Sequence, residues 1–92
     1  MKNSKVNYPQ YAKELSMAQK FTLLCRALNI YYGKRIMVMI EYTAQKWCEK
    51  LGIPVFGMRL VFEGLGDKVA VLYIAYRVET GLREVGCKIN LR

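Results

Sequence analysis

The end of the chain decides the fold: Lys68-Val-Ala-Val-Leu-Tyr-Ile-Ala-Tyr-Arg-Val-Glu-Thr-Gly-Leu-Arg-Glu-Val-Gly-Cys-Lys-Ile-Asn-Leu91. On both sides of Thr80-Gly81, large apolar residues recur at every second position, which is the side-chain period of a β-strand. A short Thr-Gly loop supplies the glycine that a hairpin turn needs for a positive φ. The stretch therefore predicts a hairpin with strands over 68–79 and 82–91.

The predicted loop also sets a register. If Glu79 faces Leu82, one face of the hairpin consists of apolar pairs: Tyr76–Val85, Ile74–Cys87, Leu72–Ile89 and Ala70–Leu91. The opposite face holds the remaining pairs: Arg77–Glu84, Ala75–Gly86, Tyr73–Lys88 and Val71–Asn90. A slip of one residue would exchange the two faces, so we expect the apolar face to cover the core.

A third strand is predicted over 56–62, where Phe56, Met58, Leu60 and Phe62 alternate with smaller or polar residues. The connection over 64–68 is turn-rich. An odd-length loop keeps the large residues of both strands on the same face, and it places Leu60 beside Leu72 and Arg59 beside Tyr73.

Two helices are predicted before the strands. Ser16-Met-Ala-Gln19 is a capping-box sequence, and an apolar stripe follows at helical spacing: Met17, Phe21, Leu24, Leu28 and Tyr32. Residues 35–51 are ambiguous, because Ile36–Ile40 alone suits a strand, but the longer window favours a helix ended by Gly52 and Pro54. The expected fold is α+β: two N-terminal helices packed on one face of a three-stranded antiparallel meander. We expect a single domain over 1–92, with 1–8 as a flexible basic arm.

Positive charge is concentrated at the start of the chain. The net charge is +8, of which residues 1–35 carry +6 and residues 36–92 carry +2. Such concentration indicates an anionic partner, such as nucleic acid or an acidic protein. The candidate contacts in this region are Lys13, Lys20, Lys34 and Arg35.

Residue usage argues against an enzyme. The chain has no histidine and three widely spaced cysteines, so we expect no catalytic residue, metal or cofactor. An odd cysteine count indicates a reducing, cytoplasmic location. The longest apolar runs are far too short to span a bilayer, and no membrane association is expected.

The solvent face of the predicted sheet is the main candidate site. In the expected register, Arg59, Tyr73 and Lys88 form a row of cations around a tyrosine, with Arg77 nearby. Such a row could stack a nucleic-acid base and hold its phosphate. The neighbouring row, Gly57, Ala75 and Gly86, is nearly flat and has Val61 and Val71 beyond it. A flat, half-apolar face is more typical of a protein interface or a homodimer.

Two other interpretations arise from the residues. Thr43–Val61 fits the spacing of a helix-turn-helix motif, with the hairpin as a wing, although only Arg59 could then read bases. Gly33–Ile36 and Trp47–Ile53 resemble the motif region of the GNAT-type N-acetyltransferases, and Val69–Tyr73 and Gly81–Gly86 resemble the C-terminal segment of that family. This resemblance covers residues 33–86. Arg35 and Met37 stand where the family has glycines for the acetyl-CoA pyrophosphate, which implies a degenerate, non-catalytic fragment.

The sequence as a whole predicts a small non-enzymatic binding protein. The first hypothesis is a protein-binding adaptor or inhibitor, acting on a protein or nucleoprotein complex. The alternative is direct binding of RNA or DNA through the basic helix and the cation–tyrosine row.

Overall fold

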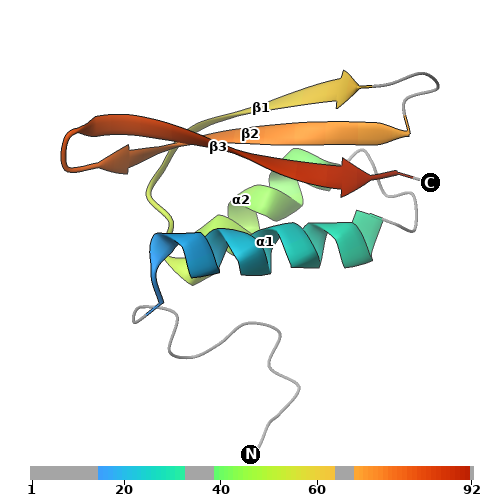
Figure 1. The fold of residues 1–92 in the computed structure, drawn as a ribbon. Helices are drawn as coiled ribbons and strands as arrows, with labels where there is room; N and C mark the ends of the chain where they lie inside the picture. Colours follow the sequence, from blue (N-terminus) through green and yellow to red (C-terminus); the bar gives the residue numbers. More distant parts are fainter. Residues whose placement is uncertain (1–14, 33–38, 64–67, 92) are drawn as a thin grey trace, which may run out of the picture.

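The computed structural model describes residues 15–32, 39–63 and 68–91. Helices α1 (Met17–Tyr32) and α2 (Ile40–Leu51) precede strands β1 (Val55–Glu63), β2 (Val69–Val78) and β3 (Gly81–Asn90). The strands form an antiparallel sheet in the order β1-β2-β3, and both helices lie on one face of it (Figure 1). This is the predicted α+β architecture.

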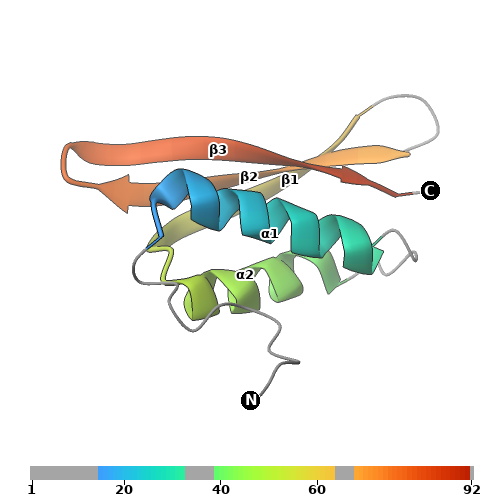
Figure 2. The same ribbon diagram turned by 60° about the horizontal axis from the view of Figure 1, so that its bottom comes forward.

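The turned view shows the two layers clearly: the helices lie side by side beneath the sheet, with α1 along β3 (Figure 2). Helix α1 packs against both β3 and α2, and α2 packs against β1. No described helix or strand covers the other face of the sheet, which we call the open face.

The predicted capping box starts α1. The backbone N–H of Gln19 donates to Ser16 Oγ at 3.2 Å, and the N–H of Ser16 donates to Gln19 Oε1 at 2.8 Å. This reciprocal pair satisfies backbone N–H groups that the first turn leaves without partners.

Helix α2 ends at the predicted glycine. Gly52 adopts φ 75°, ψ 32°, and its N–H bonds to the carbonyls of Cys48 and Glu49. This left-handed conformation costs glycine little because it has no Cβ. The structure describes the helix from Ile40, with Met39 as N-cap, and the predicted start at Arg35 lies outside the described residues.

The core lies between the helices and the sheet. Its most deeply buried members come from every element except β1: Leu24, Leu28, Ile40, Cys48, Leu51, Leu72, Ile74, Cys87 and Ile89. Phe21 of α1 packs against Tyr76 of β2, with ring centroids 4.9 Å apart and ring planes tilted by 50°. The predicted helix stripe is confirmed at Phe21, Leu24 and Leu28.

Lys20 is an exception to the polar surface of α1, since only 8% of it is exposed. A methyl group at Gly52 would lie 3.5 Å from Lys20 Nζ, so the ammonium sits at the C-terminal end of α2. A cation there is favoured because the last carbonyls of a helix carry partial negative charge. The sequence predicts Lys20 as a contact for an anionic partner, but the residue is buried because α1 packs on α2 as well as on the sheet.

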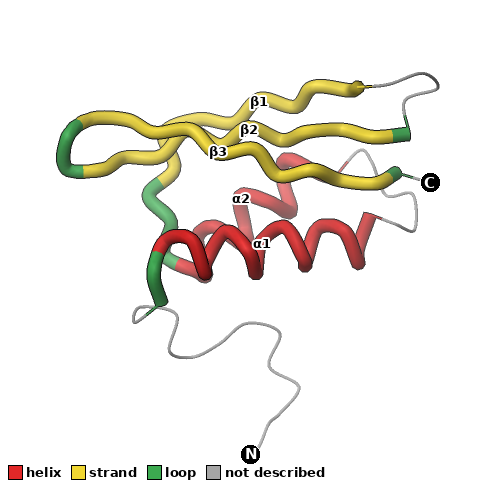
Figure 3. The backbone as a smooth tube through the Cα atoms, in the orientation of Figure 1, coloured by secondary structure: helices red, strands yellow, loops and turns green. Residues whose placement is uncertain are grey.

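The two strand registers differ in how well the sequence predicted them. Between β1 and β2, Leu60 pairs with Leu72 and Arg59 with Tyr73, as predicted. Between β2 and β3 the predicted register is wrong by two residues: Val78 pairs with Gly81, and Glu79-Thr80 forms the loop at one end of the sheet (Figure 3). Gly81, at φ 134°, starts β3 rather than lying within the turn. A shift of two keeps each side chain on its predicted face but changes its neighbours.

A bulge alters the start of β1. Val55 pairs with Tyr76 and Gly57 with Ala75, which leaves Phe56 without a partner. The extra residue puts Val55 against the core and leaves Phe56 58% exposed. The prediction that Phe56 faces the core is therefore wrong, because a bulge reverses the alternation on one side of it.

The helix-turn-helix alternative is also wrong. The residues that would form the second helix are the strand β1, fully paired with β2 from Gly57 to Glu63.

Candidate functional site

The open face carries one side chain from every second position of each strand. Across the three strands its rows are Glu63–Val69–Asn90, Val61–Val71–Lys88, Arg59–Tyr73–Gly86 and Gly57–Ala75–Glu84, and beyond them Arg77 pairs with Leu82. The centre of the face is thus small or apolar, and most charged residues lie on the two outer strands.

Arg59 lies across the face. Its guanidinium carbon is 4.4 Å from the centroid of the Tyr73 ring, and its Nη2 is 3.3 Å from Oε2 of Glu84 on β3. One side chain from β1 therefore passes over β2 and pairs with an acid on β3. The stack on Tyr73 is a cation–π contact, and the exposed ion pair adds little stability by itself.

Tyr73 is bounded on its other side by Gly86. A methyl group at Gly86 would lie 3.3 Å from Tyr73 Cε1 and 3.1 Å from Val71 Cγ1. The aromatic ring covers backbone that the glycine leaves bare, as cross-strand aromatic residues do beside strand glycines. Tyr73 therefore lies between the Arg59 guanidinium and the backbone of β3 at Gly86.

A second cation–aromatic contact lies near the hairpin end of the face. The Arg77 guanidinium carbon is 5.0 Å from the centroid of Phe56, the residue that the bulge turns outward. The sequence did not predict this contact, because it depends on the bulge.

The predicted binding rows need correction. Arg59 and Tyr73 are neighbours as expected, but Lys88 lies opposite Val71, and Gly86 takes its place beside Tyr73. Gly57 and Ala75 are neighbours as expected, but Glu84 completes their row in place of Gly86. Both errors come from the two-residue shift in the hairpin.

Of the four basic residues predicted as contacts in the N-terminal half, the structure describes Lys20 alone. Lys20 is buried, with its ammonium beside Gly52 at the end of α2. Lys13, Lys34 and Arg35 lie outside the described residues. On the open face itself the charges nearly balance: the cations are Arg59, Arg77 and Lys88, and the acids are Glu63 and Glu84.

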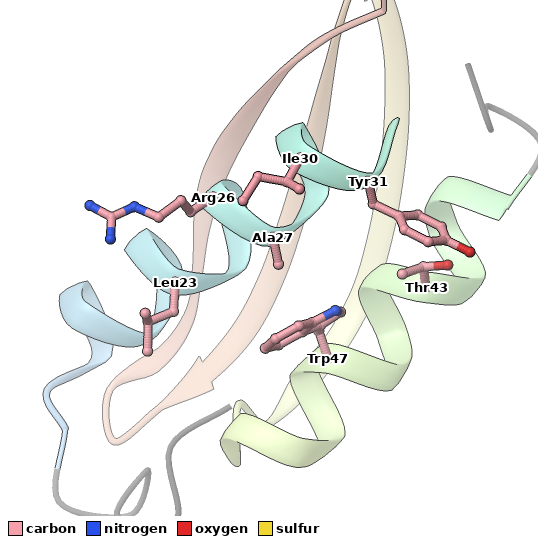
Figure 4. A pocket seen from close by; sticks show the side chains of 7 residues that line it. All are labelled: Leu23, Arg26, Ala27, Ile30, Tyr31, Thr43 and Trp47. Atoms are coloured by element: carbon pink, nitrogen blue, oxygen red, sulfur yellow. The ribbon is translucent and has the colours of Figure 1, made fainter. Parts of the chain in front are cut away.

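A second surface lies between the helices, on the side away from the sheet. Figure 4 shows Trp47 of α2 pointing toward α1, while the charged end of Arg26 extends outward from α1. The groove has a volume of about 600 Å³ and is lined by Leu23, Arg26, Ala27, Ile30, Tyr31, Thr43 and Trp47. Ile30 at its rim is 69% exposed. The spacing Leu23–Ala27–Ile30 is a second helical stripe, and it is the signal in the sequence that corresponds to this groove.

The three cysteines are free thiols inside the fold. Burial raises the pKa of Cys48 to about 12, and the Glu49 carboxylate adds to the effect. A hydrogen bond with Cys87 lowers the pKa of Cys25, while the same bond and burial raise the pKa of Cys87. Cys48 and Cys87 are thus protonated near neutral pH and act as small apolar core residues.

Within the described ranges, no group of three or more acidic, cysteine or histidine side chains is placed to hold a metal ion. Over the same residues, neither helix has the length and hydropathy to cross a bilayer. Comparison with known proteins finds no matching family model, and no curated protein or solved structure matches significantly.

Proposed function

We propose that this protein is a non-enzymatic binding module whose open face docks on a protein partner, as an adaptor or an inhibitor. The observation that carries the proposal is the position of Arg59, which lies over Tyr73 and pairs with Glu84. The guanidinium occupies the surface that a stacked base would need, and its charge is already matched by an acid.

The composition of the face supports a protein partner. Its centre is formed by Val61, Val71 and Ala75, and charged groups of both signs surround that centre. An apolar centre with a polar rim is the usual anatomy of a protein interface. A nucleic-acid surface is much more positively charged than protein interfaces are.

Ala75→Arg tests the face directly. Ala75 lies on the central strand between Gly57 and Glu84, so the substitution places a long cation at the middle of the proposed interface. Glu79→Arg adds a cation in the hairpin loop and serves as the matched control. We expect the wild type and Glu79→Arg to capture the same protein from a nuclease-treated lysate, and Ala75→Arg to lose it while its melting temperature changes little. Equal capture by the wild type and both variants would show that the open face is not the binding surface.

A salt titration decides between this proposal and direct nucleic-acid binding. Affinity for a generic oligonucleotide that is strong at low salt and falls steeply with salt would favour the nucleic-acid alternative, because phosphate contacts release counterions. We expect no such affinity from the described surface. An increase in melting temperature with acetyl-CoA would instead support the acetyltransferase-like interpretation.

A further inference from the structure

We propose that the free edge of β1 pairs with β1 of a second copy, forming a two-fold antiparallel dimer centred on Val61. This inference goes beyond the proposed function, because its backbone contacts lie at the edge of the sheet rather than on its open face; the two proposals share the Arg59 side chain.

The two edges of the sheet differ. Asn29 of α1 bonds to the outer edge of β3 through the carbonyl of Lys88 and the N–H of Asn90. Strand β1 is the other edge, and from Gly57 to Glu63 its pairing with β2 is regular. A regularly paired edge strand is a template for another strand.

The hydrogen-bond pattern shows which backbone groups of β1 have no partner among the described residues. The N–H of Arg77 donates to the carbonyl of Pro54, so β2 bonds to β1 through its odd-numbered residues. Their partners in β1 are Gly57, Arg59, Val61 and Glu63. Bonded and non-bonded positions alternate along an antiparallel strand. The N–H and C=O groups of Leu60 and Phe62 therefore point to the free edge.

Charge selects the register. Pairing centred on Val61 sets Arg59 of each copy opposite Glu63 of the other, which gives two opposite-charge pairs on the open face. Pairing centred on Arg59 would set two guanidinium groups against each other, and pairing centred on Leu60 would oppose Arg59 to Val61. In the single chain the guanidinium lies over β2 and engages Glu84 on β3, so Arg59 must rotate toward the β1 edge to reach Glu63 of the other copy. The exposed ion pair that it leaves contributes little stability.

The register centred on Val61 also brings apolar side chains of the two copies together. On the helix side of the sheet, Leu60 of one copy meets Phe62 of the other, and the exchange of backbone hydrogen bonds occurs at this pair. Phe62 is 44% exposed in the single chain, so pairing covers a ring that the fold leaves open. On the open face, Val61 meets its own copy at the two-fold axis.

A charge-reversal experiment tests the pairing on the full chain. We expect the wild type to dimerise in sedimentation equilibrium, and Glu63→Arg to weaken the dimer by about tenfold or more, because both cross-strand pairs become repulsive. Glu79→Arg changes the net charge equally, away from β1, and should dimerise like the wild type. A wild type that stays monomeric up to about 1 mM, or equal weakening by both variants, overturns the proposal.

Mixing two variants distinguishes pairing from a structural effect. Arg59→Glu and Glu63→Arg should each associate poorly alone. Mixed, they should form a heterodimer, since every Arg59–Glu63 position then holds opposite charges. Failure of two folded variants to associate on mixing would count against the register.

A cross-link tests the two-fold axis without changing charge. In a Cys25→Ser background, Val61→Cys should give a disulfide-linked dimer with mild oxidant, because a non-hydrogen-bonded antiparallel pair brings the two Cβ atoms together. Val71→Cys lies on the same face one strand inward and should remain uncross-linked. Equal cross-linking of the two would contradict the placement of the axis, and this arm holds even if Arg59→Glu does not fold.

Discussion

The side chain of Asn29 in α1 accepts a hydrogen bond from the backbone N–H of Asn90 in β3, with its Oδ1 3.0 Å from the nitrogen. Its Nδ2 donates to the carbonyls of Lys88 at 3.0 Å and of its own-helix neighbour Cys25 at 3.1 Å. One amide thus ties the helix layer to the edge of the sheet, and residues 61 positions apart in the chain are joined.

Removal of this amide should loosen the outer edge of β3. We expect Asn29→Ala to lower the free energy of unfolding by about 1–2 kcal/mol, because the strand loses two hydrogen bonds to its backbone. Hydrogen exchange of the Asn90 amide should accelerate. Asn29→Asp keeps the acceptor for Asn90 but loses both donor contacts, so it should protect that amide better than alanine does. Unchanged exchange at Asn90 in Asn29→Ala would show that the contact does not hold the strand.

Lys20 should stabilise the end of α2. Methionine is unbranched and of similar length to lysine but uncharged, so replacing Lys20 by methionine removes the positive charge beside Gly52. We expect Lys20→Met to lower the free energy of unfolding by about 1 kcal/mol, through the lost interaction with the helix dipole, as measured by urea unfolding. Lys46→Met, on the exposed side of α2, is the control and should change stability by less than about 0.5 kcal/mol. If Lys20→Met loses no more stability than Lys46→Met, Lys20 does not stabilise the end of α2.

The two glycines of the open face should respond differently to alanine. A methyl group at Gly57 meets nothing within 4 Å, whereas at Gly86 it meets Val71 and Tyr73 at 3.1–3.3 Å. Gly57→Ala should therefore stabilise the strand by up to about 1 kcal/mol, because alanine loses less backbone entropy on folding. Gly86→Ala should fall short of that gain, since the Tyr73 ring must shift. Thermal unfolding of the two variants gives the comparison, and a larger gain at Gly86 would contradict the observed register.

Stability should fall at alkaline pH because of Cys48. Its ordinary pKa of 9.0 rises to about 12 in the fold, so the unfolded chain ionises first as the pH increases. This thiol has no effect below about pH 9, and between pH 9 and 12 it disfavours the folded state by up to about 1.4 kcal/mol per pH unit. Cys48→Ala should show a shallower decline in urea unfolding between pH 9 and 10. If the free energy of unfolding falls equally in the wild type and in Cys48→Ala over this pH range, Cys48 is not the cause.

The fold was predictable because its signals are local. The capping box at Ser16, the glycine stop at Gly52 and the alternation in the strands each depend on a few adjacent residues. The first two are confirmed, and the alternation is confirmed except at the Phe56 bulge. The register of β1 on β2 was also predictable, since an odd-length connection that keeps the large residues on one face leaves few choices.

The site was less predictable because it depends on which residues of neighbouring strands lie opposite each other. Alternation distinguishes the two faces of a hairpin but not a shift of two residues, and the position of Gly81 at the start of β3 decides that shift. Lys88 therefore lies opposite Val71 and not, as predicted, beside Tyr73. The burial of Lys20 was missed because a single apolar stripe describes contact with one neighbour, whereas α1 contacts both α2 and the sheet.

The difference between the two edges of the sheet also limits the number of chains that can join. A chain with two equivalent free edges adds strands without end and grows into a fibre. Here Asn29 occupies one edge at Lys88 and Asn90, and the bulge at Phe56 interrupts the other beyond Gly57. Once two β1 strands have paired, the outer edge that remains in each copy is that of β3, which Asn29 already occupies at its C-terminal end. A third chain could add only along the hairpin end of β3, so the geometry favours two chains over open-ended growth.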